Sequence, residues 1–302
     1  MRVAVTGAGG RLGRAVVAAL ADAPFTGPAG PIAWARDAFD LDAPDDIGTR
    51  IDADRPEVVV HAAAWTDVDG CALNPELAIR RNGVATGILA EACATRGVDL
   101  LVVSTNEVFD GTRLDGHGYK PGEPVNPGNP YGASKAAGER LATEAYLAAG
   151  PRATFGIART AWLFGAPGND FPSRLLDNAD KAVAAGAPLR VVNDEWGTPT
   201  YTADVADAIV ELLADDATAG IHHLVNGLFA TRADWERYVV GRARLEVEIV
   251  DVPASTWERP SRPPRWGVLE PTPLPSGEPM RAWPDAMADY APALLRSRRV
   301  RA

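Results

Sequence analysis

The chain has 302 residues, of which 46% are hydrophobic and 23% charged, as in a globular protein with one large domain or two small ones. A formal net charge of −10 argues against nucleic acid or an anionic membrane surface as the main partner, and no apolar run approaches the length of a membrane span. Two cysteines, Cys71 and Cys93, supply neither a disulfide framework nor a metal cluster, and the N-terminus lacks a signal-peptide pattern, so we expect a cytoplasmic protein without a metal site.

Short β-branched runs alternate with alanine-rich helical patterns in the first half of the chain. Strands are predicted at 2–6, 31–35, 57–63, 98–104 and 153–160, and helices at 11–22, 74–96 and 131–149. Near-continuous apolar strands separated by helices are typical of a parallel sheet that is covered on both faces. We therefore predict an α/β fold with a doubly wound parallel sheet, of the Rossmann type, over residues 1–165.

The second half has a looser pattern. Helices are predicted at 171–186 and 201–215, and strands at 188–192 and 221–225. Residues 252–284 are crowded with proline, which cannot donate to a β-ladder, so we expect ordered loop there. We predict that residues 166–302 form mainly a smaller C-terminal substrate-binding lobe, with strands and helices that return to the first domain. Such a lobe would cap the carboxyl edge of the sheet, where ligands bind in open α/β folds.

The first predicted strand runs into a glycine-rich turn, TGAGGRLG. Gly7, Gly10 and Gly13 would permit a tight turn and close approach to a pyrophosphate, which would rest on the N-terminus of the following helix. This pattern predicts a dinucleotide site. After the second predicted strand, an acidic residue suits the 2′-hydroxyl of NAD, whereas an arginine suits the 2′-phosphate of NADP. Arg36 and Asp40 both lie there, so the choice between NADH and NADPH stays open.

A phenol and an ammonium group lie one helical turn apart in NPYGASKAAGE, residues 129–139. Tyr131 and Lys135 share a helix face, and a neighbouring ammonium is expected to lower the pKa of the tyrosine and make it a better acid and base. Ser104 and Thr105 end the preceding strand, at the edge where a nicotinamide would lie. A carbonyl oxygen gains charge when hydride reaches its carbon, and it needs donors already in place. The candidate catalytic groups are therefore Tyr131, Lys135 and a hydroxyl from Ser104 or Thr105.

Together these motifs resemble the extended short-chain dehydrogenase/reductase family. More narrowly, the chain is similar to the dTDP-4-dehydrorhamnose reductases, and the similarity extends from Met1 to about residue 285. The matching stretches are HAAAWTDVDGCALNPELAIRRN, STNEVFDG, NPYGASKAAGE, ARTAWLFG, DEWGTPTYTADVADAI and RPPRWGVL.

The resemblance implies reduction of the C4 carbonyl of a dTDP-4-keto-6-deoxy sugar by NADPH or NADH, with dTDP-4-dehydrorhamnose to dTDP-L-rhamnose as the leading expectation. It implies that Thr105, Tyr131 and Lys135 are the catalytic set, and it is compatible with a homodimer. Further residues implied to contact the cofactor are Gly10, Arg11, Leu12, Asp40, Leu41, Ala62, Ala63, Ala64 and Trp65. Those implied to contact the sugar nucleotide are Val68, Asn106 and Trp162, while Asn82 matches a position behind the site. Because guanidinium groups match phosphate oxygens, Arg262 or Arg265 is expected at the nucleotide diphosphate.

One position departs from the family pattern. The reductases usually carry an aspartate and a tyrosine after the serine–threonine pair, where this chain has Asn106 and Glu107. A glutamate there is similar to the related sugar-nucleotide 4,6-dehydratases, with the pattern STDEV, but Asn106 cannot supply their acid. Glu107 is interpreted as a base for epimerisation, a group that hydrogen-bonds the substrate or a solvated side chain. Two further functions stay open: an epimerase or dehydratase that retains NAD, and a non-catalytic regulatory subunit on the same fold.

Overall fold

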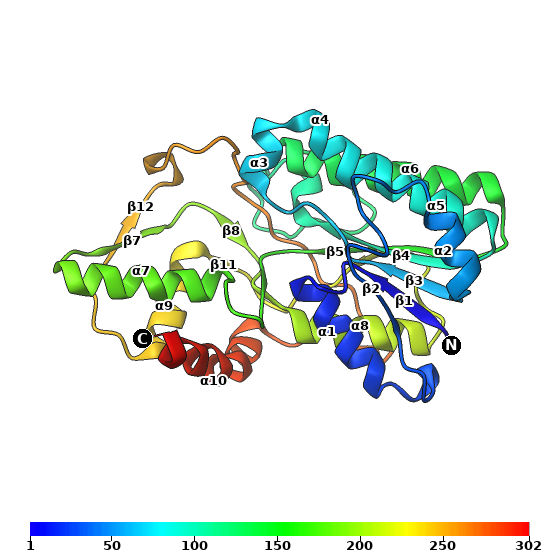
Figure 1. Cartoon of the computed structure of the whole chain (residues 1–302). Helices are drawn as coiled ribbons and strands as arrows, with labels where there is room; N and C mark the ends of the chain where they lie inside the picture. The colour runs from blue at the N-terminus through cyan, green and yellow to red at the C-terminus, as the bar shows by residue number, and fades with distance from the viewer. Residues whose placement is uncertain (302) are drawn as a thin grey trace.

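A parallel sheet forms the centre of the larger part of the molecule (Figure 1). The computed structural model describes the backbone of residues 1–301 and the side chains of residues 1–298. In this part of the chain the strand order is β10-β5-β4-β3-β1-β2, and all neighbours are parallel. The strands are β1 (Val3–Thr6), β2 (Ile32–Trp34), β3 (Val58–His61), β4 (Asp99–Thr105), β5 (Phe155–Thr160) and β10 (Gly220–His223). The predicted doubly wound α/β fold is confirmed.

Helices cover both faces of this sheet (Figure 1). Neighbouring residues of a strand point to opposite faces, so β1 places Val3 and Val5 in the core under one helix layer and Ala4 in the core under the other. The first layer contains α1 (Arg11–Asp22) and α8 (Thr202–Ala214). The second contains α2 (Ile47–Asp54), α5 (Ala85–Thr95) and α6 (Pro130–Ala149).

The helix predicted over residues 74–96 contains a π-helical turn. It consists of α4 (Pro75–Ala78), the π-helical turn η2 (Ile79–Val84) and α5, and α3 (Val68–Leu73) precedes it. A π-turn widens the helix locally and is often found at functional sites. Here it contains Asn82, which is buried against α6.

A second core lies in the lobe at the left of Figure 1. Its centre is Trp235, which is fully buried. The lobe contains α7 (Phe171–Ala185), α9 (Arg232–Ala243), α10 (Trp283–Arg301) and the strand pairs β7 (Leu189–Val192) with β12 (Ile249–Val252), and β8 (Trp196–Gly197) with β11 (Ala230–Thr231). A third pair, β6 (Leu163–Phe164) with β9 (Thr200–Tyr201), packs beside it. In contrast, α8 and β10 pack with the central sheet, so the chain beyond residue 165 contributes to both cores.

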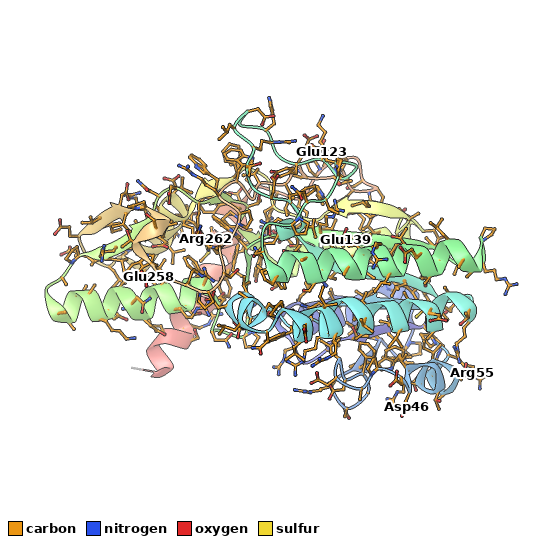
Figure 2. All side chains as sticks on the ribbon, turned by 90° about the horizontal axis from the view of Figure 1, so that it is seen from above. Asp46, Arg55, Glu123, Glu139, Glu258 and Arg262 are labelled. Atoms are coloured by element: carbon orange, nitrogen blue, oxygen red, sulfur yellow. The ribbon has the colours of Figure 1, made fainter. Side chains whose placement is uncertain are left out.

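The proline-rich segment 252–284 connects the two parts. After the 3-10 turn η4 (Ala254–Thr256) it runs mainly as loop, with Leu269 bridged to Tyr119 and Trp266 bridged to Trp196. Figure 2 labels Glu258 and Arg262, which belong to this segment. The segment therefore reaches the ends of the sheet strands from the side of the lobe.

Candidate functional site

The turn between β1 and α1 offers backbone N–H groups to an anion. Gly7 has a φ of 64°, and a Cβ there would lie 2.8 Å from both the Cα and the N of Ala63. Only glycine therefore lets this turn lie so close to the segment that follows β3. In the described residues no side chain caps α1, so its first N–H groups stay available to phosphate oxygens.

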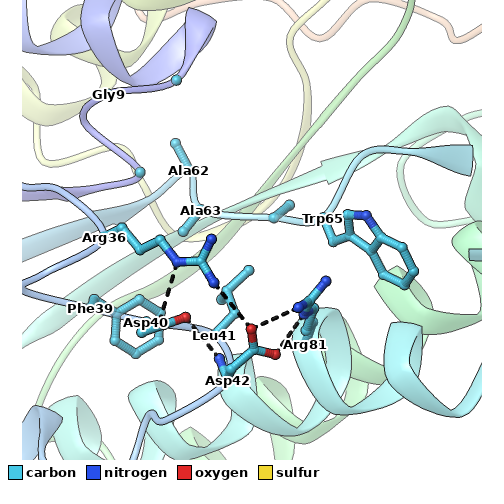
Figure 3. Close-up of a pocket in the computed structure, with 13 residues that line it drawn as sticks. Gly9, Arg36, Phe39, Asp40, Leu41, Asp42, Ala62, Ala63, Trp65 and Arg81 are labelled. Carbon is cyan, nitrogen blue, oxygen red and sulfur yellow. Dashed lines mark hydrogen bonds and ion pairs between the residues drawn. The ribbon is translucent and has the colours of Figure 1, made fainter. Parts of the chain in front are cut away.

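A cavity of about 330 Å³ opens beside this turn (Figure 3). It lies between the ends of neighbouring strands β1 and β3, which is the place where open α/β sheets bind nucleotides. Its walls combine the glycine turn with the loop after β2 and the segment after β3. The lining residues are Gly7, Gly9, Gly10, Arg36, Phe39, Asp40, Leu41, Asp42, Ala62, Ala63, Ala64, Trp65 and Arg81.

Two arginines and two aspartates form a charged wall in this cavity (Figure 3). Arg36 Nε lies 3.3 Å from Asp40 Oδ2, and its NH2 lies 3.2 Å from Asp42 Oδ2. Arg81 binds both oxygens of Asp42, at 2.6 and 2.7 Å, and lies over the Trp65 ring at 5.0 Å. These contacts hold the pKa of the Asp42 carboxyl below its usual value, chiefly through the Arg81 hydrogen bonds. Of the two arginines, Arg36 is the more exposed and makes the longer contacts, so it can meet a new anion with less rearrangement.

A second cavity, of about 560 Å³, continues from the first and shares Gly10, Ala62 and Ala64 with it. It brings together the ends of β4 and β5, the start of α6 and the start of α7. The remaining lining residues are Arg11, Leu12, Gly13, Thr66, Val68, Val103, Ser104, Thr105, Asn106, Glu107, Tyr131, Lys135, Thr160, Ala161, Trp162, Leu163, Asn169, Asp170, Phe171 and Arg174.

The start of α6 positions the phenol and the ammonium group. The Asn129 side chain caps the helix by accepting a hydrogen bond from the Gly132 N–H at 2.8 Å, and Pro130 occupies the first turn. Tyr131 and Lys135 are only 8% and 3% exposed, and both side chains line the larger cavity. Thr105, at the end of β4, lines the same cavity. The three predicted catalytic side chains therefore lie around one volume.

Burial controls the titration of both groups on α6. It lowers the pKa of Lys135 to about 8, an effect that the nearby Glu139 carboxylate partly offsets. It also raises the pKa of Tyr131, and the charge of Glu107 raises it further, whereas the Thr105 side chain acts in the opposite direction. The expectation that Lys135 lowers the pKa of Tyr131 was thus wrong for the protein alone, because desolvation of the phenolate dominates. The phenol stays protonated at neutral pH and is ready to act as an acid.

Glu107 lies at the wall of the larger cavity and is half-buried. Its Oε2 accepts a hydrogen bond from Asn129 Nδ2 at 2.7 Å, and no ion pair within the described residues holds it. Burial raises the pKa of its carboxyl, and the bond from Asn129 partly offsets that effect. Of the three interpretations, a simply solvated side chain fits this environment least well.

Asn106 and Trp162 are fixed by long-range contacts. Asn106 Nδ2 donates to Gly267 O at 3.0 Å, which ties the end of β4 to the proline-rich segment. Trp162 has a φ of 38°, which is uncommon for a bulky residue, and its ring packs under the Arg232 guanidinium at 4.1 Å. Gly197 lies against the same ring and leaves no room for a Cβ. Both residues line the larger cavity in fixed orientations.

Three predicted arginines lie in different places. Arg262 and Arg265 are exposed and are not among the residues that line either cavity. Arg11 lines the larger cavity, but its guanidinium donates to Gly165 O at 2.5 Å and Asn169 Oδ1 at 2.6 Å. In this structure Arg11 therefore holds the loop before α7 against the phosphate turn.

Several lining residues were not predicted from the sequence. Arg81 belongs to a stretch that carries the family resemblance but was given no role, and Asp42, Asp170, Phe171 and Arg174 belong to none of those stretches. A signal existed for Asp170, whose side chain accepts a hydrogen bond from the Ser173 N–H and caps α7. The pattern D-F-P-S is typical of such a helix start.

Within the described residues, no group of three or more His, Cys, Asp and Glu side chains is placed to hold a metal ion. Over the same residues, none of the helices combines the length and the apolar character that spanning a membrane requires.

The chain is similar to known proteins over nearly its whole length. The family model described as RmlD substrate binding domain matches residues 1–295. A dTDP-4-dehydrorhamnose reductase from Streptomyces griseus is 35% identical, over 96% of this chain and 93% of that protein. A dTDP-4-dehydrorhamnose reductase structure from Clostridium acetobutylicum superposes with a TM-score of 0.86 and 27% identity, over 97% of this chain and 99% of that one. Another, from Bacillus anthracis in complex with NADP, gives a TM-score of 0.84 and 26% identity, over 96% and 98% of the two chains.

Proposed function

Because the chain belongs to the dTDP-4-dehydrorhamnose reductase family, we propose that it uses NADPH or NADH to reduce the C4 carbonyl of a dTDP-4-keto-6-deoxy sugar. The proposed reaction is the conversion of dTDP-4-dehydrorhamnose to dTDP-L-rhamnose. One observation carries the proposal: Thr105, Tyr131 and Lys135 line a cavity that continues into the cavity beside the phosphate turn.

The residues present fit a nicotinamide dinucleotide. The uncapped N-terminus of α1 suits the pyrophosphate, and the glycine turn leaves no room for a Cβ at Gly7. The smaller cavity would hold the adenosine, beside Asp40 and Leu41, and the segment from Ala62 to Trp65 would lie along the cofactor. The bound cofactor supplies the hydride that reaches C4 of the sugar.

The side chains of the larger cavity would complete the reduction. Tyr131, which is protonated at neutral pH, donates its proton to the C4 oxygen as negative charge develops there. Thr105 donates a hydrogen bond to the same oxygen. Lys135, which is charged below about pH 8, stabilises the phenolate that remains and binds the cofactor ribose. Val68, Asn106, Glu107 and Trp162 line the surrounding wall and would contact the sugar nucleotide.

The lobe is proposed to hold the nucleotide part of the substrate. Residues 166–302 supply Asn169, Asp170, Phe171 and Arg174 to the larger cavity, and the guanidinium of Arg174 would suit a diphosphate. Arg262, which the resemblance suggested for that role, would need to move in order to take part. We further propose that the protein acts in the cytoplasm, a reducing compartment that suits its two buried free thiols, and that it forms a homodimer.

The test is the oxidation of NADPH, and in parallel NADH, by the purified protein in the presence of dTDP-4-keto-6-deoxyglucose, with and without a 3,5-epimerase. Oxidation that requires the epimerase supports the rhamnose-forming reaction. Oxidation without it would mean that the unepimerised sugar is accepted or that Glu107 assists epimerisation. No oxidation under either condition would contradict the proposed function. Sedimentation of the same sample tests the homodimer.

A further inference from the structure

A row of buried polar side chains lies behind the segment that lines both cavities. It consists of Thr6, His61, Thr86, Asn82 and Ser134, none of which is more than 1% exposed. They come from β1, β3, α5, η2 and α6. Buried polar groups are costly unless they are hydrogen-bonded, so each bond in such a row matters for stability and for geometry.

The donor and the acceptor of each hydrogen bond around His61 can be assigned from its neighbours. Thr86 Oγ1 donates to Asn82 O at 2.8 Å, which leaves an oxygen lone pair for the His61 Nε2–H at 3.0 Å. The imidazole is neutral, because burial lowers the pKa of His61 to about 3. Its Nδ1 therefore accepts from the Thr6 hydroxyl at 2.7 Å, and Thr6 Oγ1 accepts from the Ala63 N–H at 3.2 Å.

Asn82 continues the row toward the catalytic helix. Its Oδ1 accepts from the Trp65 N–H at 2.7 Å, and its Nδ2 donates to Trp65 O and to Ser134 Oγ, both at 3.0 Å. The Trp65 N–H can only donate, so the orientation of the Asn82 amide is fixed. Ser134 Oγ then donates to Tyr131 O at 2.7 Å. The row thus links Ala63 and Trp65 to the first turn of α6.

We propose that His61 is a positioning residue for the reduction: through Thr6 and Thr86 it fixes the Ala63–Trp65 segment relative to the helix that carries Tyr131. His61 itself is not among the residues that line either cavity. Its role requires an acceptor and a donor on opposite ring nitrogens, which the neutral Nε2–H tautomer provides. A charged imidazole would place a second N–H donor against Thr6 Oγ1 and leave the hydroxyl hydrogen without this acceptor. The proposal rests on the proposed function, because it assumes that the nicotinamide cofactor lies along this segment.

The test removes the acceptor for His61 without touching either cavity. Thr86→Val deletes the hydroxyl, whereas Thr86→Ser keeps it. Thr95→Val is the matched control, because Thr95 Oγ1 makes the same bond to a carbonyl four residues earlier, Glu91 O at 2.8 Å, on an exposed part of α5. We expect Thr86→Val to raise the dissociation constant for NADPH about tenfold, while the other two variants stay within about twofold of the parent. Fluorescence titration of the full chain measures all four proteins.

Nitrogen NMR of histidine-labelled protein tests the tautomer without a substrate. The His61 signals, assigned by their loss in His61→Gln, should show a protonated Nε2 and an unprotonated Nδ1 with no titration between about pH 5 and about pH 8. A titrating His61, or a proton on Nδ1, would overturn the proposal. So would a Thr86→Val protein that melts at a lower temperature but binds NADPH as tightly as the parent, because the row would then be merely structural. Failure of the proposed function looks different: NADPH binds normally, but no sugar nucleotide is reduced.

Discussion

In the smaller cavity the charged side chains are exposed or half-buried, whereas in the larger cavity Tyr131 and Lys135 are buried. Arg36 is 76% exposed and makes single contacts of more than 3 Å with two aspartates. Tyr131 and Lys135 are at most 8% exposed, and burial shifts the pKa of each. Water screens the exposed charges, so they exchange partners at little cost, but a buried group depends on fixed neighbours. We therefore expect substitutions of the exposed residues in the smaller cavity to be tolerated. Substitutions of the buried residues in the larger cavity should lower activity severely.

The largest effect is expected for Tyr131→Phe. This substitution removes the proton donor and leaves the ring in place, so kcat should fall by a factor on the order of a thousand. Tyr146→Phe is the matched control on the same helix, because the Tyr146 hydroxyl donates only to Val98 O, at 2.5 Å, away from both cavities. Steady-state rates of NADPH oxidation compare the two. An active Tyr131→Phe protein would mean that another group supplies the proton.

A buried ion pair between β5 and α6 should contribute much more to stability than an exposed pair within α6. Arg159 binds both oxygens of Glu139, at 3.0 and 2.7 Å, and their side chains are 2% and 7% exposed. Arg159→Met leaves a buried carboxylate unpaired and should lower the free energy of unfolding by about 3–5 kcal/mol.

The comparison is Arg140→Ala. It breaks a pair with Glu144 whose side chains are 60% and 56% exposed, and it should cost no more than about 0.5 kcal/mol. Urea unfolding measures both variants. Equal losses would show that burial does not distinguish the two pairs.

The buried lysine predicts the pH dependence of the reaction. Lys135 has a pKa of about 8, below the ordinary 10.5, so it is charged below that pH and neutral above it. If the ammonium group supports proton transfer, kcat should fall as the pH rises through about 8, approaching tenfold per unit. Lys135→Arg provides the control, because a guanidinium stays charged and should remove this alkaline decline. A wild-type rate that is constant to about pH 10 would contradict this role.

The smallest effect is expected for a substitution in the smaller cavity, where the adenosine is proposed to bind. Arg36→Ala removes the exposed cation beside Asp40 and Asp42, so we expect the ratio of kcat/KM for NADPH to that for NADH to fall about fivefold. Arg50→Ala is a suitable control, because Arg50 pairs with Asp54 at 2.8 Å and lines neither cavity. An unchanged ratio would show that Arg36 does not contact the 2′-phosphate.

Local patterns were enough to predict where the residues of the candidate site that lie at strand ends and helix starts are placed in the fold. The glycine turn follows β1, and Tyr131 and Lys135 open α6, so spacing alone placed them, whereas the choice of Thr105 over Ser104 at the end of β4 rested on the family resemblance. The fold class was predicted in the same way, from apolar strands that alternate with helices. Helix α9 was missed, although Thr231 and Asp234 form a capping box that indicates its start.

Contacts between distant segments could not be predicted. Asn106 meets Gly267 across 161 residues, Arg11 meets Gly165 across 154, and Arg81 meets Asp42 across 39. No local spacing encodes such pairs, because they depend on how segments that are distant in the sequence pack together in the fold. The pKa of Tyr131 was missed for a related reason. Sequence adjacency indicated the ammonium group, but the desolvation that dominates comes from the folded surroundings.

We propose that the two cavities form one site, in which the smaller cavity binds the adenosine and Tyr131 in the larger cavity protonates the substrate. A crystal structure of the protein with NADPH and dTDP-L-rhamnose tests it most directly. We expect adenosine in the cavity beside Arg36 and Asp40, and the sugar C4 oxygen within hydrogen-bond distance of the Tyr131 hydroxyl. Adenosine bound elsewhere, or a C4 oxygen that contacts neither Tyr131 nor Thr105, would contradict the proposed site.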